Sequence, residues 1–266
     1  MVFPRPRPPE RSDPASCGTH RACRSCWRDP GALPQGHGRI RRYAAGADLA
    51  AQGEPPADIL TLIEGWLLLS ALLSDGRRQI LHIVVPGDVV VPLLVGSAGF
   101  GIQAATDATV CAMPVAAATT SPTAHPAGLH VLMKAMSRNA AMAYEHLTAV
   151  GRRTARERVA LLLVELYYRC RRAAIPDHAV QIPLTQGVLA DALGLTAVHV
   201  NRTLKTLRAD GLVAYEGGML RILDPDRLAA AACFDVEAAG AWLGPCPPGP
   251  PTPVPPTAPM PPGASR

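Results

Sequence analysis

The hydrophobic pattern of the chain changes its period at about residue 126, and this change constrains the fold more than any other feature. Before it, from Tyr43 to about Pro114, short apolar runs are separated by turn residues such as Gly65 and Pro86-Gly87-Asp88. Runs of this length are typical of an antiparallel β-barrel or sandwich. Beyond it, apolar residues recur with the period of an α-helix. The sequence therefore predicts an α+β fold, with an N-terminal antiparallel β-barrel of jelly-roll type followed by helices.

The clearest unit of the predicted barrel is a hairpin. Two apolar segments, Trp66–Leu73 and Arg77–Val85, flank the short turn Ser74-Asp75-Gly76. Glycine supplies the positive φ angle that a tight hairpin turn requires. We expect these segments to pair as antiparallel strands.

The first predicted helix, from about Pro126 to Val150, has apolar residues spaced alternately by four and three, as in a coiled-coil seam. The seam residues are Leu129, Met133, Met136, Ala140, Ala143, Leu147 and Val150. About 25 residues make a helix ~37 Å long, longer than is needed to cover a barrel. Its two alanines also allow close approach of a second helix. We expect a two-fold dimer helix, and the alternative is an amphipathic helix packed on its own barrel.

A second helix is predicted from about Thr154 to Arg172, and Ile175-Pro176-Asp177 ends it. Its apolar face consists of Val159, Leu162, Leu163, Leu166 and Tyr167.

Residues 183–222 predict a helix-turn-helix followed by a small hairpin. Thr185 and Thr196 can each cap a helix, and Gly194 between them allows the tight turn. In the second helix Val200, Leu204 and Leu207 repeat with helical spacing and form its buried side. Gly211–Tyr215 and Met219–Ile222 then flank Glu216-Gly217-Gly218, which predicts a wing.

The outer face of that second helix carries Val198, Asn201, Arg202 and Lys205. Arginine can bridge O6 and N7 of guanine, asparagine can pair with adenine, and lysine and a helix N-terminus can hold phosphates. This face therefore suits the major groove of DNA. The alternative is a redox or ligand-binding module whose polar helix contacts protein, which a salt-dependent gel shift would distinguish.

Charge and motif content narrow the function further. The formal net charge is +5, and residues 134–228 carry fourteen basic against nine acidic side chains, which suggests a polyanionic partner. No apolar run approaches the ~18–20 residues of a membrane span, and no P-loop, G-x-S-x-G or H-E-x-x-H motif indicates an enzyme. An odd count of seven cysteines and the absence of a secretory signal predict a cytoplasmic protein.

Together these features resemble the Crp/Fnr superfamily of transcription regulators, over roughly residues 39–228. The barrel motifs that carry the resemblance are Tyr43-Ala44-Ala45-Gly46, Gly53, Leu62-Ile63-Glu64-Gly65, Asp75-Gly76-Arg77-Arg78-Gln79-Ile80 and Pro86-Gly87-Asp88. Gly151-Arg152-Arg153-Thr154-Ala155-Arg156-Glu157-Arg158-Val159 and the winged helix carry it in the second half. The resemblance implies a homodimer that binds palindromic promoter DNA, contacts RNA polymerase and senses an effector through its barrel.

The resemblance also implies a division of the chain into five parts. These are a flexible Cys-containing segment (1–38), a cyclic-nucleotide-binding-type barrel (39–125), a dimerisation helix (126–151), a winged helix-turn-helix (152–228) and an Ala- then Pro-rich tail, mostly disordered (229–266).

Within the recognition helix the resemblance assigns roles residue by residue. Arg202 aligns with a base-reading arginine, Lys205 with a phosphate contact and His199 with a backbone contact. Val198 stands where the best-known members have a base-reading glutamate, so their half-site sequence does not carry over.

The barrel departs from two sensing modes of the superfamily. Members that bind cyclic AMP pair its phosphate with an arginine after the small helix of the barrel, whereas residues 96–102 contain none. A buried phosphate without that partner is strongly unfavourable, so the sequence argues against cyclic AMP. Haem would need an axial Cys or His, and the lone candidate, His82, is better explained as a hydrogen-bonded surface residue.

Four cysteines leave the effector open. Cys17, Cys23 and Cys26 form a C-x5-C-x2-C pattern, and Cys111 lies in the sequence Val110-Cys111-Ala112-Met113-Pro114. Oxygen-sensing members of the superfamily hold a four-iron cluster with such a set, although their longer gap comes second. Four thiolates suit an iron–sulfur cluster or tetrahedral zinc. The alternative is that the tail thiols bind no metal and Cys111 is an ordinary small strand residue.

Overall fold

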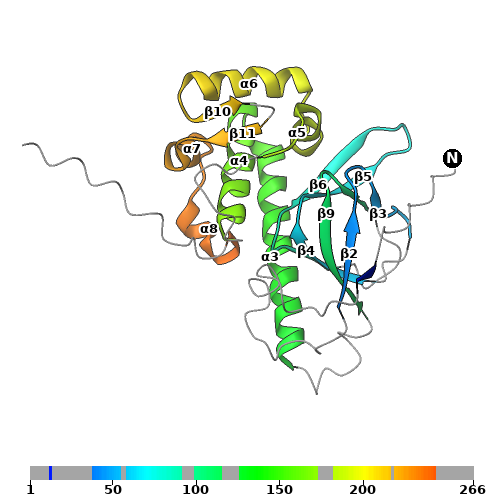
Figure 1. The fold of residues 1–266 in the computed structure, drawn as a ribbon. Coiled ribbons are helices and arrows are strands. Elements are labelled where there is room, and N and C mark those ends of the chain that lie inside the picture. Colours follow the sequence, from blue (N-terminus) through cyan, green and yellow to red (C-terminus); the bar gives the residue numbers. More distant parts are fainter. Residues whose placement is uncertain are drawn as a thin grey trace, which may run out of the picture.

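The computed structural model describes residues 12–13, 38–54, 58–91, 99–115, 126–172, 182–216 and 219–243. Figure 1 shows a β-sheet domain on one side of a long helix, α3, and a helical domain on the other. The three parts expected from the sequence, a barrel, a long helix and a winged helix-turn-helix, are all present.

The β-domain consists of two antiparallel sheets that face each other as a jelly-roll-type barrel. One sheet has the strand order β1-β2-β9-β4-β7 and the other β3-β8-β5-β6. The strands are β1 (Ser12–Asp13), β2 (Arg39–Tyr43), β3 (Asp48–Ala50), β4 (Asp58–Glu64), β5 (Leu67–Leu72), β6 (Arg78–Val84), β7 (Val89–Val90), β8 (Gly101–Ala104) and β9 (Ala108–Pro114). Strands of both sheets supply the apolar core between them, including Leu62, Leu67 and Val110, all fully buried.

The predicted hairpin is confirmed. Strands β5 and β6 pair antiparallel, from Leu67 opposite Val84 to Leu72 opposite Arg78. Gly76 in the turn has φ +88°, the left-handed conformation that the sequence required of it.

The long helix α3 (Pro126–Arg152) ends two residues after the predicted end at Val150, and α4 (Ala155–Arg172) follows after a sharp bend. A capping box starts α4. The Glu157 carboxylate accepts from the backbone N–H of Thr154 at 2.7 Å, and the Thr154 hydroxyl accepts from the N–H of Glu157 at 3.4 Å. These bonds satisfy two amides that a helix start would otherwise leave unpaired.

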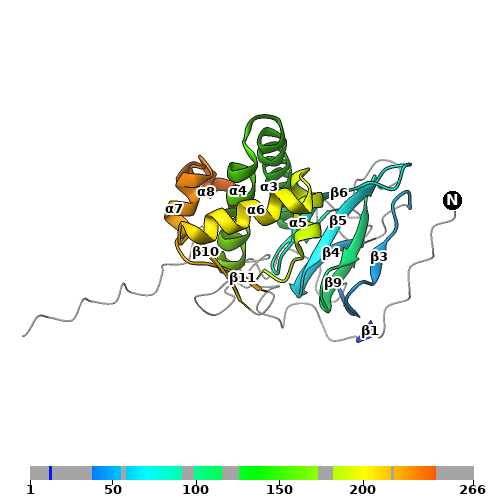
Figure 2. The same ribbon diagram turned by 90° about the horizontal axis from the view of Figure 1, so that it is seen from above.

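The remaining elements form the helical domain. They are α5 (Gln186–Leu193), α6 (Ala197–Ala209), β10 (Val213–Glu216), β11 (Met219–Ile222), α7 (Pro225–Ala231) and α8 (Val236–Leu243). Seen from above in Figure 2, α6 lies across this domain with α5 between it and the barrel. None of the helices in the described ranges is long and apolar enough to cross a membrane.

The Ala-rich stretch after residue 228 corrects the expectation of disorder. It completes α7 and then forms α8, which packs against both α3 and α4. Ala239 and Leu243 are buried there, and the rings of Phe234 and Trp242 lie 6.0 Å apart. Alanine has the highest helix propensity of the common residues, so this composition suits a docked helix. The Pro-rich residues 244–266 lie outside the described ranges.

A single apolar core joins the barrel to the helical domain. The outward side of the β5–β6 sheet, with Trp66, Leu68 and Ile83, packs against α4 and continues into the helix-turn-helix. Every residue of α4 from Val159 to Leu166 is buried, so this helix is enclosed on all sides rather than on the one face that the sequence predicted.

A cluster of buried charges lies inside this core. Arg169 of α4 donates to Glu165 at 2.5 Å, to the carbonyl of Ile83 at 2.6 Å and to the carboxylate of Asp88, in the turn between β6 and β7. From α3, Arg138 donates to Asp88 at 2.9 Å, and His146 lies 2.5 Å from Glu165. The cluster therefore connects the barrel, the long helix and α4.

The pKa shifts show how strongly the cluster holds its charges. Burial opposes ionisation of Glu165, yet His146 and Arg169 outweigh it and lower the pKa of Glu165 to about 2. Desolvation lowers the pKa of His146, but the contact with Glu165 raises it overall. Desolvation and the charge of Arg169 lower the pKa of His82 to about 3, so its neutral ring accepts from Arg169 at 3.0 Å. His82 is thus hydrogen-bonded as expected, but it is half-buried rather than on the surface.

We expect Arg169→Met to lower the free energy of unfolding by about 3–5 kcal/mol, because it removes the fully buried cation that two buried carboxylates share, Asp88 and Glu165. Urea unfolding of the purified protein measures this loss. Arg78→Met is the matched control, since the Arg78–Asp191 pair is partly exposed and should be worth no more than about 1 kcal/mol. Equal losses for the two variants would contradict a structural role of the buried cluster.

Candidate nucleic-acid interface

The helix-turn-helix is built by the local signals that the sequence predicted. The hydroxyl of Thr185 accepts from the N–H of Val188, and that of Thr196 accepts from the N–H of His199, each at 3.2 Å. Gly194 ends α5 with φ +62°, in the left-handed conformation. The two caps and the glycine fix where α5 stops and where α6 begins.

The inner side of α6 is also confirmed. Val200, Leu204 and Leu207 are buried against the rest of the domain, together with Thr203. From α5, Leu189, Ala190 and Leu193 are buried and pack in the same core. This packing fixes the rotation of α6 and therefore decides which of its side chains face solvent.

Val198, His199, Arg202 and Lys205 are exposed on the outer side of α6, where the sequence predicted DNA contacts. Both capping threonines are exposed as well. The first turns of α5 and α6 contain no acidic residue. Their N-terminal N–H groups and partial positive charges therefore meet no carboxylate that would repel a phosphate.

Asn201 differs from the expectation. Its side chain is only half-exposed, because its amide donates to the side-chain oxygen of Gln186 at 2.9 Å. The bond joins the middle of α6 to the first residue of α5, so Asn201 positions the two helices relative to each other. Sequence reasoning missed Gln186, although a polar residue directly after the Thr185 cap is a signal that could have found it.

The predicted wing is present as two paired strands. Strands β10 and β11 are antiparallel, with Val213 opposite Ile222 and Glu216 opposite Met219. The two glycines between the strands lie outside the described residues. The wing follows α6 directly, as it does in winged helix-turn-helix domains.

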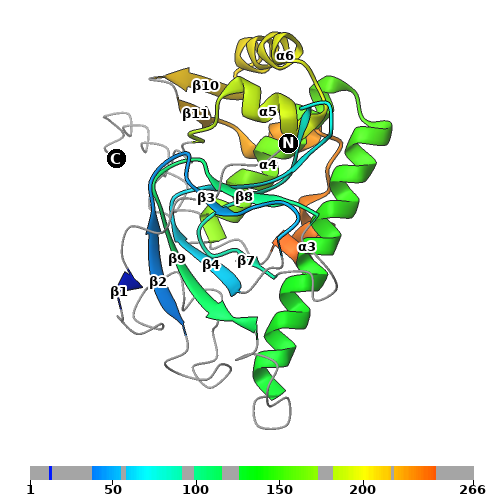
Figure 3. The ribbon, with the colours of Figure 1, turned by 90° about the vertical axis from the view of Figure 1, so that its right-hand side faces the viewer.

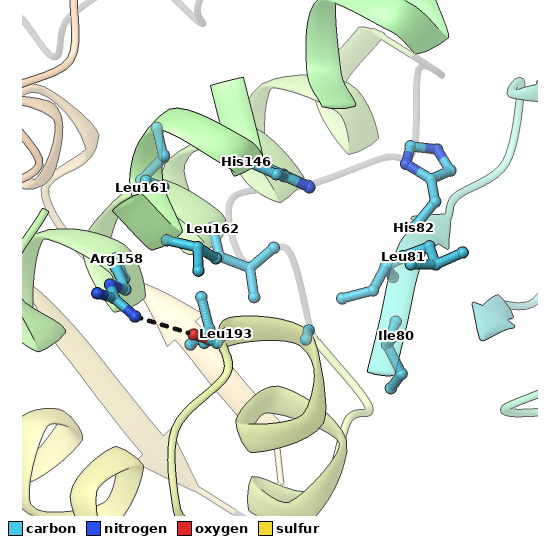
Figure 4. A pocket seen from close by; sticks show the side chains of 12 residues that line it. Ile80, Leu81, His82, His146, Arg158, Leu161, Leu162 and Leu193 are labelled. Atoms are coloured by element: carbon cyan, nitrogen blue, oxygen red, sulfur yellow. Dashed lines mark hydrogen bonds between the residues drawn. The ribbon is translucent and has the colours of Figure 1, made fainter. Parts of the chain in front are cut away.

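The barrel contacts this domain through α5. Arg78 on β6 forms an ion pair with Asp191 at 2.8 Å, and the Gln79 amide donates to the carbonyl of Ala192 at 3.2 Å. Beside these contacts lies a mainly apolar pocket of about 390 Å³, counted out to its open mouth. Its walls come from β6, α3, α4 and α5, and Figure 4 shows Arg158 donating to the carbonyl of Leu193 within its lining. Residues from four elements meet here, so no local pattern predicts this pocket.

Of the four candidate metal-ligating thiols, the structure describes only Cys111. It lies on β9, is 4% exposed and packs with Ile40 and Ile63. Cys17, Cys23 and Cys26 lie outside the described residues. Ser12 and Asp13, a few residues before them, pair with Arg41 and Ile40 of β2, the strand next to β9. Residues 12 and 13 thus lie two strands from Cys111 in this sheet.

The sequence argument against cyclic AMP also concerns a partly described region. Residues 92–98 lie outside the described ranges, and the chain resumes at Gly99, just before β8. The absence of arginine from residues 96–102 is a fact of the sequence, so the expectation that the barrel does not bind cyclic AMP stays a prediction, which calorimetry tests.

Comparison with known proteins agrees with this architecture. Residues 40–119 match the cyclic nucleotide-binding domain family, and residues 157–231 match the Crp-like helix-turn-helix domain family. The chain is 31% identical over 195 residues to the nitrogen fixation regulation protein FixK of Bradyrhizobium diazoefficiens, covering 73% of this chain and 82% of that protein. It is 30% identical over 227 residues to a probable transcriptional activator of Rhizobium leguminosarum bv. viciae, with coverage of 81% and 94%. The solved structure of FixK2 from Bradyrhizobium japonicum superposes with a TM-score of 0.66 at 25% identity, covering 73% of this chain and 96% of that one.

A β-barrel joined by a long helix to a winged helix-turn-helix with an exposed basic face defines a DNA-binding transcription regulator. The chain belongs to the Crp/Fnr family of such regulators. The family consists of transcription regulators and not of enzymes, as the sequence predicted. The fold class and the main functional hypothesis are both confirmed.

Two single substitutions on α6 should separate base contacts from phosphate contacts. We expect Arg202→Ala to cost about 1–3 kcal/mol on the target sequence and little on random DNA, because it removes a base contact. Lys205→Ala should weaken binding to all DNA sequences alike. It should also reduce the slope of the logarithm of the binding constant against the logarithm of the salt concentration by about one. Both side chains are exposed, so neither substitution should unfold the domain. Fluorescence anisotropy over a salt series measures both quantities, and equal losses on specific and random DNA for Arg202→Ala would exclude its base-reading role.

Proposed function

We propose that the protein acts as a homodimer that binds two-fold symmetric promoter DNA, and that its barrel controls this binding. Helix α6 of each subunit enters one of two successive major grooves. The observation that supports dimerisation most directly is an apolar face on α3 that is exposed in the described part of the chain.

This α3 face consists of large side chains at the spacing of a coiled-coil seam. Met133 is 60% exposed, Met136 46%, Leu147 71% and the neighbouring Tyr144 70%. Ala143 is exposed and Ala140 half-exposed at the centre of the same face. The side chain of Leu129, the first residue of the expected seam, lies outside the described residues.

An adjacent side of α3 is already occupied. Leu132, Met142 and Ala149 are buried against the rest of the chain. Figure 3 shows α3 along one edge of the molecule, with the barrel on its inner side. The helix therefore has two apolar faces, and a contiguous exposed one typically marks an interface. A second copy of the same helix fits it, because the central alanines allow close approach and a seam of this spacing is self-complementary.

Control by the barrel is supported by the contacts that reach the helical domain. Asp88 of the barrel binds Arg169 of α4, and Arg78 binds Asp191 of α5. A ligand that shifts β6 or the turn before β7 would move these partners and bias the position of α6. The family membership further supports the proposal that promoter-bound dimers contact RNA polymerase, which a supershift with purified polymerase would test.

We expect Met136→Glu combined with Ala140→Glu to produce a monomer, because both substitutions place charges inside the apolar α3 face. Analytical ultracentrifugation should show half the wild-type mass, and specific DNA binding should be lost. Lys134→Glu is the matched control, since it adds a glutamate at an exposed position of the same helix outside that face. A double variant that stays dimeric would refute the seam.

The four-thiolate site of Cys17, Cys23, Cys26 and Cys111 stays a prediction, and a metal and sulfide assay on protein purified without oxygen tests it. About four iron atoms per chain and a visible band bleached by air would assign the thiols to an iron–sulfur cluster. Zinc without iron would assign them a structural role. Cys111→Ala should abolish the bound metal in either case, whereas Cys170→Ala, also a buried cysteine, should retain it. A metal-free, colourless wild type would contradict the site.

A further inference from the structure

Val198 is the most exposed large apolar side chain in the described part of the chain, at 78%. It is the second residue of α6 and lies on the outer side of that helix. The next most exposed, Leu147 and Tyr144, belong to the α3 face that dimerisation would cover. Dimerisation through α3 would not cover Val198, because this side chain lies on the surface of α6 that would face DNA.

The position of Val198 relative to Arg202 places both on one face. Residues four apart on a helix lie one above the other, about 6 Å apart along its axis. Base pairs stack at about 3.4 Å, so the two side chains reach base pairs that lie one or two steps apart. In a helix-turn-helix, the N-terminal residues of the recognition helix are the ones that contact base edges.

The chemistry of valine limits what it can read there. Its side chain has no donor and no acceptor, so it cannot bind the amino, carbonyl or N7 groups of the base edges. The C5-methyl group of thymine is the apolar feature that the major groove offers. We propose that Val198 determines specificity by packing against this methyl group of a thymine one or two base pairs from the guanine that Arg202 reads.

This inference rests on the proposed function and specifies which base the same site reads. Burial of one methyl-sized group is worth about 0.8 kcal/mol, which corresponds to about fourfold in affinity. A two-fold symmetric site contains the contact twice, so loss of both methyl groups should weaken binding about sixteenfold.

The experiment begins with selection of binding sites from random DNA by the full-length protein. Each thymine of the selected site, with its symmetry mate, is then replaced by uracil, which removes the methyl group and preserves every hydrogen-bonding group. We expect the replacement of one symmetric thymine pair to lower the DNA-binding affinity about sixteenfold, measured by anisotropy titration. This pair should lie one or two base pairs from the guanine that Arg202 reads. That guanine is identified as the base whose replacement no longer weakens binding by the Arg202→Ala variant.

Three variants assign that loss to a side chain. In the Val198→Ala variant, the loss of affinity caused by replacing thymine with uracil (the uracil penalty) should shrink to less than twofold per half-site. Leu223→Ala, which truncates an exposed aliphatic residue outside α6, should keep the full penalty. Val198→Glu should select cytosine at the same position, because a carboxylate accepts from its N4 amino group.

The outcomes separate the inference from the proposed function. If selection enriches no sequence, the proposed function fails and the inference fails with it. If a sequence is enriched but no uracil replacement near the guanine weakens binding, the inference alone is wrong. A uracil penalty that persists in Val198→Ala would likewise overturn the assignment to Val198.

Discussion

The arrangement of the whole molecule depends on the burial of Arg169. A guanidinium with no exposed surface is tolerated only where carboxylates and carbonyls surround it, and here the barrel and α4 supply them while α3 binds the same two carboxylates. Asp88 belongs to the barrel, Glu165 to α4, and Arg138 of α3 shares Asp88. Removing any of these elements would leave a buried charge uncompensated, so the barrel, α3 and α4 have one well-defined mutual position.

This constraint leaves α3 with a second role. Because its inner face is fixed against the barrel and α4, its outer apolar face is presented in a defined direction along the edge of the molecule. The same helix can therefore carry a dimer seam on one side and charged contacts to the barrel on the other. A change in the barrel at Asp88 would reach Arg138 on α3 and Arg169 on α4 directly, so the proposed coupling between the barrel and the dimer helix needs no long chain of intermediates.

The sequence predicted those features whose causes lie within a few residues. The caps at Thr185 and Thr196, the turn at Gly194 and the hairpin at Gly76 each depend on local backbone requirements, and the structure has all four. The buried charges could not be predicted, because Asp88 and Arg169 are 81 residues apart in the chain. The one local sign of this cluster in the sequence is Glu165, which stands among the apolar residues of α4. A buried carboxylate needs a cationic partner, but the neighbouring residues do not show which one.

Two other differences have similar physical reasons. The role of Asn201 depends on Gln186, which lies 15 residues away on the other helix, so the polar spacing of α6 alone placed Asn201 on the outer face. On sequence alone, the Ala-rich stretch after residue 228 is grouped with the Pro-rich tail as mostly disordered, yet α8 buries Ala239 and Leu243 and packs on a surface that α3 and α4 provide. Cys17, Cys23 and Cys26 lie outside the described residues, so the structure does not test the prediction that they bind a metal.

With Asn201 bonded to Gln186, the base contacts proposed for α6 are those of Arg202 and Val198. A good bidentate contact discriminates by about 1–3 kcal/mol, and a methyl contact adds about 0.8 kcal/mol. One subunit therefore supplies roughly 2–4 kcal/mol, at or below the lower end of the ~4–10 kcal/mol that separates specific from non-specific binding. Two half-sites double the discrimination and bring it into that range. The proposed two-fold symmetric dimer on a two-fold symmetric site thus accounts both for the small number of base-reading side chains on α6 and for the exposed apolar face of α3.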